Sequence, residues 1–330
     1  MTIRARIVGT GGYAPPRVVS NEDMAKIVDT SDEWIRTRTG IRERRLIDFE
    51  GQMGTADMAE HAARQALEAA GWKPDDVELI VVGTVTPDLR LPSCAILLQD
   101  KLQAKNAAAF DVVAACAGSA YALSVADKFI RSGAIKRALV IGGETLTTIT
   151  NWQDRNTCVL FGDAAGCFAV EASDDSGPGL LDIDIYSDSN GWNFIMIEKG
   201  GSKNPLTAED LVARRDRMTM NGREVYKFAV RSLVDAAQKI LTRNGFSTAD
   251  VSLVCAHQAN LRIIEAIAER TGIPLERFVV NIDRYGNTSS ASLPITFNEA
   301  RRAGRMKAGD LVLMMAIGAG MTWSAALYRA

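Results

Sequence analysis

The chain has 330 residues, of which 47% are hydrophobic and 24% charged, and its formal net charge is −2 at pH 7. This composition is that of an ordinary globular protein, and the length suits two domains of about 100–200 residues or one large domain with two halves. A general nucleic-acid-binding protein would carry a strong basic excess, so the charge argues against that class. The uncharged apolar stretch 112–126 falls short of the roughly 18 residues that a membrane helix needs.

The cysteines indicate a reducing environment. There are five of them, an odd number, and no two are spaced as a C-x-x-C pair. We therefore expect neither a disulfide framework nor a zinc site, and we expect a cytoplasmic protein. The N-terminal apolar stretch is too short and too rich in glycine and proline for a signal peptide.

Short apolar runs rich in β-branched residues are interpreted as strands buried on both faces. In chain order they are residues 79–85, 109–114, 138–141, 253–256, 278–282 and 311–316. Longer stretches with helical periodicity lie between them, at residues 55–70, 119–132, 222–243 and 261–271. This alternation predicts an α/β protein with largely parallel sheets.

The order of these elements repeats along the chain. A strand begins near Val77 and its counterpart near Val251, which is 174 positions later. Cys116 and Asn287, each at a turn from a strand to a helix, are 171 positions apart. Several landmarks in nearly one register predict a duplicated fold. The polar, Gly/Pro-rich stretch 173–179 would separate the halves, which are residues 1–174 and 175–330.

Three polar side chains lie at the expected carboxyl ends of strands, where ligands gather in parallel α/β sheets. Cys116 opens a helix, whose dipole and free N–H groups would stabilise a thiolate. His257 ends the strand 253–256, and Asn287 occupies the matching turn in the second half. Each residue alone also fits a plainer interpretation: an inert buried cysteine, a hydrogen-bonded core histidine and a helix-capping asparagine. Brought together across a pseudo-twofold axis, the three predict nucleophilic catalysis by Cys116.

Two glycine-rich segments have a functional and a structural interpretation. Residues 318–320 follow a buried strand, and this turn could bring backbone N–H groups to a substrate oxygen or be only a tight turn. Residues 9–12 resemble half of a dinucleotide-binding fingerprint. That fingerprint needs a helix to start at once, and Pro15 and Pro16 interrupt it. We therefore do not expect a nicotinamide site.

With these residues in place, the whole chain resembles β-ketoacyl-acyl carrier protein synthase III. The matching motifs are DEWIRTRTGI at 32–41, AACAG at 114–118, FGDAAG at 161–166, HQANLR at 257–262, YGNTS at 285–289 and GAGMTW at 318–323. The resemblance implies a thiolase fold with five layers, α-β-α-β-α, and a catalytic set of Cys116, His257 and Asn287. Elongating synthases carry a second histidine instead, but the only other histidine here, His61, falls in a predicted helix.

The resemblance further implies a ping-pong condensation that initiates fatty acid synthesis without a cofactor or metal. An acyl-CoA primer would acylate Cys116, and malonyl-acyl carrier protein would then decarboxylate and attack the acyl group. His257 and Asn287 would bind the enolate oxygen, and the backbone N–H groups of Cys116 and Ala319 would form an oxyanion hole. Three alternatives stay open: a specialised-metabolism relative that transfers the acyl group to another acceptor, an oxidoreductase, and a catalytically silent carrier-binding module.

Binding residues also follow from the resemblance. Those for CoA are Trp34, Arg38, Arg155, Gly222 and Asn260. Those of the acyl pocket are Leu91 and Met321. Leu91 would close the pocket across a homodimer interface, and because it is smaller than an aromatic gate, longer or branched primers would fit.

Carrier-protein docking is expected at a basic surface, because acyl carrier proteins are acidic. A stripe on one helix face recurs at four-residue spacing, although a solvated helix face is the usual meaning of such a stripe. The expected docking residues are Arg223, Lys227, Arg231, Gln258 and Arg262. No nucleic-acid or membrane partner is expected.

Overall fold

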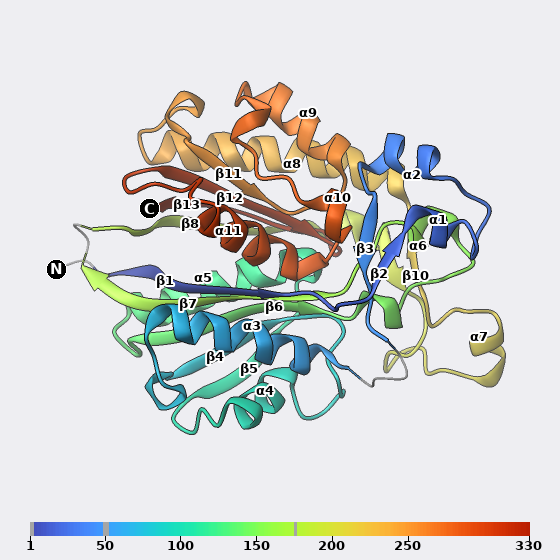
Figure 1. Ribbon diagram of the computed structural model, residues 1–330, viewed down its shortest axis with the longest axis horizontal. Coiled ribbons are helices and arrows are strands. Elements are labelled where there is room, and N and C mark those ends of the chain that lie inside the picture. Colours follow the sequence, from blue (N-terminus) through green and yellow to red (C-terminus); the bar gives the residue numbers. More distant parts are fainter. Residues whose placement is uncertain (1–2, 49–52, 175–176) are drawn as a thin grey trace.

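Two sheets alternate with three layers of helices in the computed structural model, which describes residues 3–48, 53–174 and 177–330 (Figure 1). Helices α3 and α4 cover the outer face of the first sheet, α5 and α11 lie between the sheets, and α8 and α9 cover the second sheet. Their bounds are Thr55–Ala70 (α3), Cys94–Leu102 (α4), Gly118–Arg131 (α5), Ser292–Arg302 (α11), Gly222–Arg243 (α8) and Leu261–Thr271 (α9). The predicted five-layered α/β arrangement is therefore confirmed.

The first sheet has the strand order β1-β7-β6-β4-β5. Its strands are β1 (Ile3–Tyr13), β7 (Ala164–Asp174), β6 (Arg137–Glu144), β4 (Leu79–Gly83) and β5 (Ala108–Val112). The predicted strands pair in parallel, β4 with both β5 and β6, whereas β7 pairs antiparallel with β1 and β6. The carboxyl ends of the parallel strands thus meet at one edge, which positions the turn that follows β5.

The second sheet has the strand order β11-β12-β13-β8. Its strands are β11 (Leu253–Ala256), β12 (Leu311–Gly318), β13 (Thr322–Arg329) and β8 (Gly179–Ser187). β11 and β12 are parallel, and the remaining pairs are antiparallel. The strands of the first sheet end by residue 174 and those of the second begin at residue 179. Residues 175 and 176, where the two halves were expected to join, lie outside the described residues, and the division at this position stays a prediction.

The predicted strand at residues 278–282 is wrong. Phe278 makes a single parallel bridge to Val254, and α10 (Ile282–Tyr285) begins where the strand should end. The reason is the Gln258 side chain, whose Oε1 accepts the backbone N–H groups of Asn281 and Ile282 at 3.1 and 3.2 Å. A buried side-chain amide therefore takes the hydrogen bonds that a neighbouring strand would have made.

The duplication has one register at its parallel strands and at the turns into its central helices. Elements of the second half begin 174 positions after those of the first: β11 at 253 against β4 at 79, and β12 at 311 against β6 at 137. The short 3₁₀ helices η2 (Ala115–Ala117) and η7 (Ser289–Ala291), which precede α5 and α11, keep the same offset. Cys116 therefore corresponds to Ser290, and the predicted match of Cys116 with Asn287 is wrong by three residues.

Shorter elements gather at one end of the molecule, on the right of Figure 1. They are β2 (Val18–Ser20), α1 (Asn21–Met24), α2 (Asp32–Thr39), β3 (Glu43–Arg45), α6 (Arg155–Cys158), β9 (Ile195–Ile197), α7 (Ala208–Val212) and β10 (Met218–Met220). Although α2 belongs to the first half, it contacts the second, since the Asn260 side chain donates to the Arg38 carbonyl at 3.1 Å. Both halves thus build this end of the molecule.

The core of the central layer joins the two sheets. Phe297 of α11 packs edge-to-face on Phe168 of β7, with ring centroids 5.3 Å apart, and on Tyr328 of β13 at 5.5 Å. Such aromatic contacts stabilise a core beyond the area that they bury. In the part of the chain that the structure describes, no helix is long and apolar enough to cross a membrane.

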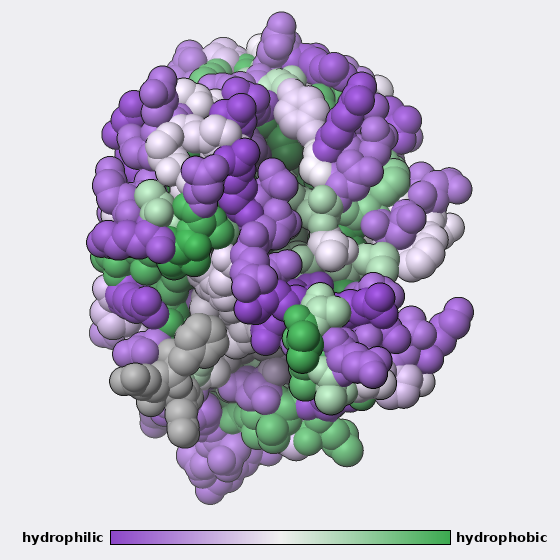
Figure 2. Space-filling model, turned by 90° about the vertical axis from the view of Figure 1, so that its right-hand side faces the viewer, coloured by the Kyte–Doolittle hydropathy of each residue, from purple (hydrophilic) through white to green (hydrophobic). Residues whose placement is uncertain are grey.

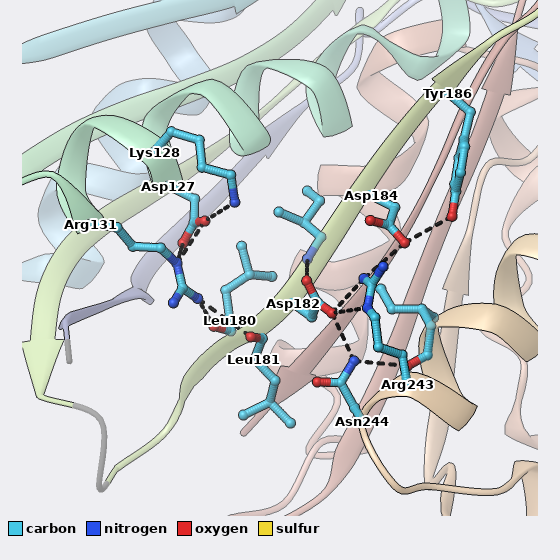
Figure 3. A network of polar contacts seen from close by, with 12 residues as sticks. Asp127, Lys128, Arg131, Leu180, Leu181, Asp182, Asp184, Tyr186, Arg243 and Asn244 are labelled. Carbon is cyan, nitrogen blue, oxygen red and sulfur yellow. Dashed lines mark hydrogen bonds and ion pairs between the residues drawn. The ribbon is translucent and has the colours of Figure 1, made fainter.

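A polar network fixes β8 to the helices on either side of it (Figure 3). Asp127 and Arg131 of α5 form an ion pair at 2.8 Å, and Arg131 also donates to the Leu180 carbonyl at 2.7 Å. Arg243, the last residue of α8, pairs with both Asp182 and Asp184 of β8. The network therefore holds the edge strand between the central and the outer helical layers.

The glycines in residues 9–12 allow a helix to pack directly on a strand. A Cβ atom on Gly9 would lie 2.1 Å from the Ala66 carbonyl oxygen, and one on Gly11 would lie 1.9 Å from that of Ala62. Helix α3 therefore rests directly on the backbone of β1. The dinucleotide interpretation of this segment has no support in the fold, because a strand and no helix start occupies residues 3–13.

Gly11→Ala should push α3 away from β1 and lower the free energy of unfolding by about 1–3 kcal/mol, as overpacking in a core does. Chemical denaturation of both proteins measures this. Gly201→Ala is the matched control, since a Cβ there meets nothing within 4 Å. Equal stability of the two variants would contradict the packing role of Gly11.

Candidate active site

One large cavity brings the three predicted catalytic residues together. It has a volume of about 1250 Å³, and Cys116, His257 and Asn287 all line it. The cavity runs toward α2 and β10, where Trp34, Arg38 and residues 218–222 form its outer part. Figure 2 shows this end of the molecule, with a hollow that exposes apolar surface between hydrophilic side chains. The site is thus an apolar tunnel with a polar mouth, which suits a long substrate.

Cys116 lies in the turn between β5 and α5. Ala115 before it has a φ of 46°, the left-handed region that residues other than glycine rarely adopt. Burial raises the pKa of the Cys116 thiol to about 12, and hydrogen bonds from Ser289 and from the backbone N–H of Cys116 only partly oppose this. The expectation of an unusually acidic cysteine is therefore wrong: desolvation outweighs the helix start, and the resting group is a thiol.

His257 follows β11 directly and continues its pairing, since its backbone N–H donates to the Met315 carbonyl at 2.8 Å. The side chain is buried, and burial lowers its pKa to about 3. Among the described residues, its Nδ1 atom has no hydrogen-bond partner. At neutral pH the cavity therefore contains an uncharged imidazole, because a cation would lose its hydration there.

Asn287 is fixed by its backbone and by its side chain. Its N–H donates to the Leu160 carbonyl at 2.8 Å, and its carbonyl accepts from Gly162 at 3.0 Å. The side-chain Oδ1 accepts the Ser289 N–H at 2.8 Å. Since Oδ1 is held in this way, Nδ2 is the end of the amide that remains to donate to a substrate oxygen.

The turn after β12 lies against the nucleophile. A Cβ atom on Gly318 would be only 2.5 Å from the Cys116 backbone nitrogen. Ala319 and Met321 line the same cavity, and Thr322 Oγ1 donates to the Ala114 carbonyl at 2.9 Å. The expected oxyanion-hole residues, Cys116 and Ala319, are thus in adjacent backbone segments.

Trp34 and two arginines form a cation–π cluster at the mouth. The Arg38 guanidinium lies 4.5 Å and that of Arg155 5.0 Å from the Trp34 ring centroid. Arg155 also donates to the Asp29 carbonyl at 2.8 Å and does not line the cavity itself. The cluster combines an aromatic face with positive charge, which suits an adenine ring with phosphates.

The other two predicted CoA residues, Gly222 and Asn260, both line the cavity but have different contacts within the protein. Gly222, the first residue of α8, lines the cavity, and a Cβ there would have room. Asn260 lines it too, but its side chain caps α9 through the Arg262 N–H and also binds the Arg38 carbonyl. Asn260 therefore holds the walls together whether or not it contacts a ligand.

Leu91 and Met321, the predicted acyl-pocket residues, lie in different places. Met321 is buried in the cavity wall. Leu91 is 87% exposed and does not line the cavity of its own chain. A role of Leu91 in the acyl pocket of its own chain is therefore not seen in this structure.

Some of the predicted docking residues are exposed, and one is buried. Arg223, Lys227 and Arg231 are exposed along one face of α8, and Arg223 and Arg262 line the cavity mouth. Gln258, however, is 1% exposed, and its Nε2 donates to the carbonyls of Ala256 and Val279. The prediction that Gln258 docks a carrier protein is wrong, because its amide is used inside the fold.

Sequence reasoning missed several residues of the site. Glu144 ends β6 as a fully buried carboxylate, and Ser289 lies between it and Cys116. The strands β9 and β10, which pair antiparallel beside the cavity, were not predicted either. A three-residue strand has too little periodicity to be found in a sequence, and a buried acid gives no sequence signal at all. In the described ranges, no cluster of His, Cys, Asp or Glu could hold a metal ion.

Comparison with known proteins identifies the family of this chain. Two family models match the chain: 3-oxoacyl-[acyl-carrier-protein] synthase III at residues 110–189, and the C-terminal part of the same enzyme at residues 241–330. A β-ketoacyl-[acyl-carrier-protein] synthase III from Xanthomonas campestris pv. campestris is 48% identical over 99% of this chain and 98% of its own length. The chain belongs to the β-ketoacyl-acyl carrier protein synthase III family.

Solved structures agree with this assignment. The synthase III of Aquifex aeolicus is 45% identical, covers 99% of this chain and 100% of its own, and superposes with a TM-score of 0.90. A priming β-ketosynthase from a polyketide biosynthetic pathway is 34% identical, with a TM-score of 0.90 and coverage of 99% and 96%. As a synthase III, the protein has the thiolase fold and is an acyltransferase that initiates fatty acid synthesis by condensation.

His257 should stay uncharged across the range in which ordinary histidines titrate. Burial lowers its pKa from 6.5 to about 3, so its neutral form should persist from about pH 8 down to about pH 5. We expect the imidazole carbon resonances of His257 to stay constant over this range, measured on His61→Gln, which leaves one histidine to observe. A midpoint near pH 6.5 would show that solvent reaches the ring.

Proposed function

We propose that this synthase III joins an acyl-CoA primer to malonyl-acyl carrier protein through a thioester on Cys116. The observation that supports this most is that a cysteine, a neutral histidine and an asparagine amide line one tunnel, whose mouth carries Trp34 and Arg38. Such a tunnel admits a long, thin substrate with an anionic head group and an apolar end. No cofactor is needed for this chemistry.

In the first half-reaction the Cys116 sulfur attacks the thioester carbon of the primer. Because the thiol is protonated at rest, its proton leaves as the S–C bond forms and ends on the departing CoA thiol. The negative charge that develops on the carbonyl oxygen would be bound by the backbone N–H groups of Cys116 and Ala319. Preorganised donors of this kind each contribute about 3–4 kcal/mol in other enzymes.

In the second half-reaction malonyl-acyl carrier protein loses CO₂, and the bond electrons form an enolate. The enolate oxygen would accept hydrogen bonds from His257 and from Nδ2 of Asn287. The enolate carbon then attacks the acyl-enzyme carbonyl, and the tetrahedral intermediate expels Cys116 as a thiolate, which takes a proton from water to restore the resting thiol. Neutral donors suit this step, because they stabilise an anion that exists only during the reaction.

A homodimer would complete the acyl pocket. β5 is the edge strand of the first sheet, so its outer backbone groups are available to a second chain. Val113, which directly follows β5, is 78% exposed, and Leu91, which precedes α4, is 87% exposed. We propose that two β5 edges pair and that Leu91 of each chain closes the tunnel of the other.

A specialised condensing enzyme is the second candidate. The similarity to a priming β-ketosynthase of a polyketide pathway favours it. The same catalytic residues serve both roles, so the primer distinguishes them. The exposed aliphatic Leu91 supports acceptance of longer or branched primers.

Incubation with a panel of acyl-CoAs should add the mass of one acyl group per chain, and malonyl-acyl carrier protein should then release a β-ketoacyl product. Intact mass spectrometry and product analysis measure the two steps. Cys116→Ala should take up no acyl group, because no other cysteine lines the tunnel among the described residues. Acyl transfer to another nucleophile, or primer exchange that survives in the variant, would contradict the proposal. A clear preference for acetyl-CoA over all longer primers would contradict the wide primer range.

Reversing the charge at the cavity mouth should impair mainly the reaction with the carrier protein. Arg223→Glu with Lys227→Glu should lower kcat/KM for malonyl-acyl carrier protein about tenfold at low salt, since steering by charge is lost. Acylation by acyl-CoA should change less, and added salt should reduce the difference. Lys239→Glu, an exposed lysine farther along α8, is the control. An equal loss in the double variant and in Lys239→Glu would exclude a local docking surface.

A further inference from the structure

Glu144 is a fully buried carboxylate at the junction of the two halves. Its Oε2 accepts the hydroxyls of Thr86 and Thr84 at 2.6 and 3.2 Å and the Val85 N–H at 3.1 Å. Its Oε1 accepts the Ser289 hydroxyl at 3.2 Å and shares the Ser290 hydroxyl, at 3.1 Å, with the Gly83 carbonyl at 2.8 Å. Within the described ranges it forms no ion pair with an Arg, Lys or His side chain. A carboxylate buried with hydroxyl donors but without a cation is costly, which points to a function.

One hydroxyl group connects this carboxylate to the nucleophile. Ser289, which binds Glu144, also forms a hydrogen bond with the Cys116 thiol. The Ser289 backbone is held in place, since its φ is 51° and its N–H is bound to Asn287 Oδ1. A hydroxyl has a single proton, so Ser289 donates either to Glu144 or to the sulfur, and accepts from the other.

We propose that Glu144 is a positioning residue of the condensing site, which sets the direction of the Ser289–Cys116 hydrogen bond and so holds the resting cysteine as a thiol. The ionised carboxylate draws the Ser289 proton to itself, which leaves the serine oxygen to accept from S–H. Its negative charge also opposes a second negative charge on the sulfur. The inference rests on the proposed function only in that Cys116 is the nucleophile.

The direction of the bond should reverse when Glu144 is neutral. A protonated Glu144 donates to Ser289, and Ser289 then donates to the sulfur and stabilises the thiolate. Burial raises the pKa of Glu144 to about 7, so this change falls near neutral pH. The other titratable groups around it are the Cys94 thiol of α4 and, beside that thiol, Asp88 and Asp111. A thiol is less easily oxidised than a thiolate, so the arrangement protects the free enzyme.

Glu144→Gln tests the inference with little change of shape. The amide oxygen can accept from Thr84, Thr86 and Val85, while the amide nitrogen faces Ser289 and Ser290 as a donor. Ser289 must then donate to the sulfur, and the buried charge is gone. Between about pH 7 and the thiol pKa, where Glu144 of the wild type is ionised, we expect iodoacetamide to alkylate Cys116 about tenfold faster in the variant, since loss of one close charge shifts a pKa by about one unit or more.

The pH profile of alkylation shows whether Glu144 sets the Ser289–Cys116 hydrogen bond or only stabilises the fold. In the wild type the logarithm of the rate should rise less steeply around pH 7, where Glu144 ionises, and the profile of Glu144→Gln should be straight there. Ser289→Ala should alkylate more slowly below about pH 7, where Ser289 of the wild type donates to the sulfur. Its inflection should be smaller than in the wild type, since only the direct effect of the Glu144 charge remains. In the double variant the gain from Glu144→Gln should largely disappear.

Glu299→Gln is the control for loss of a carboxylate, because Arg284 and not a cysteine binds that side chain. Thermal unfolding of each variant verifies the fold, and the Ser289→Ala profile tests the inference even if Glu144→Gln does not fold. Alkylation needs no substrate, so the result stands apart from any failure of the condensation assay. An unchanged or slower rate in folded Glu144→Gln above about pH 7, or an inflection in Ser289→Ala as large as in the wild type, would overturn the inference.

Discussion

The active site depends on one close backbone contact, where the turns before α5 and α11 meet at the centre of the molecule. A Cβ on Gly118, which begins α5, would lie 3.2 Å from the Ser290 Cβ, and one on Gly142 of β6 would lie 2.1 Å from the Ser290 carbonyl oxygen. The Ser290 hydroxyl donates to the Gly83 carbonyl at 2.8 Å. Because no side chain separates the turns, the Cys116 and Ser289 side chains from opposite halves become neighbours.

Burial at this contact decides the charges of the site. It raises the pKa of the Cys116 thiol to about 12 and lowers that of His257 to about 3, so both groups are neutral at rest. The reaction then creates negative charge in the cavity, and the groups that stabilise this charge are uncharged hydrogen-bond donors. Donors fixed by the fold do not have to reorganise as water would, so the stabilisation is available when the charge forms.

The sequence predicted the parallel strands and the helices well, because each is a continuous apolar run or a clear helical period. It did not predict β1, β7, β8 and β13, which pair antiparallel, nor did it predict that residues 278–282 would leave the sheet. That departure is due to the Gln258 side chain, which competes with a strand for backbone N–H groups. Only the folded chain shows which hydrogen bond is preferred.

The sequence by itself determined the α/β class, the duplication and the three catalytic candidates, since apolar runs and motif spacing are local properties of the chain. Tertiary structure decided the register of the duplication, in which Ser290 and not Asn287 matches Cys116. It also decided the protonation of the thiol, the position of Glu144 behind Ser289, and the exposure of Leu91. These features depend on burial and on contacts between residues far apart in the chain, and no local pattern of residues encodes them.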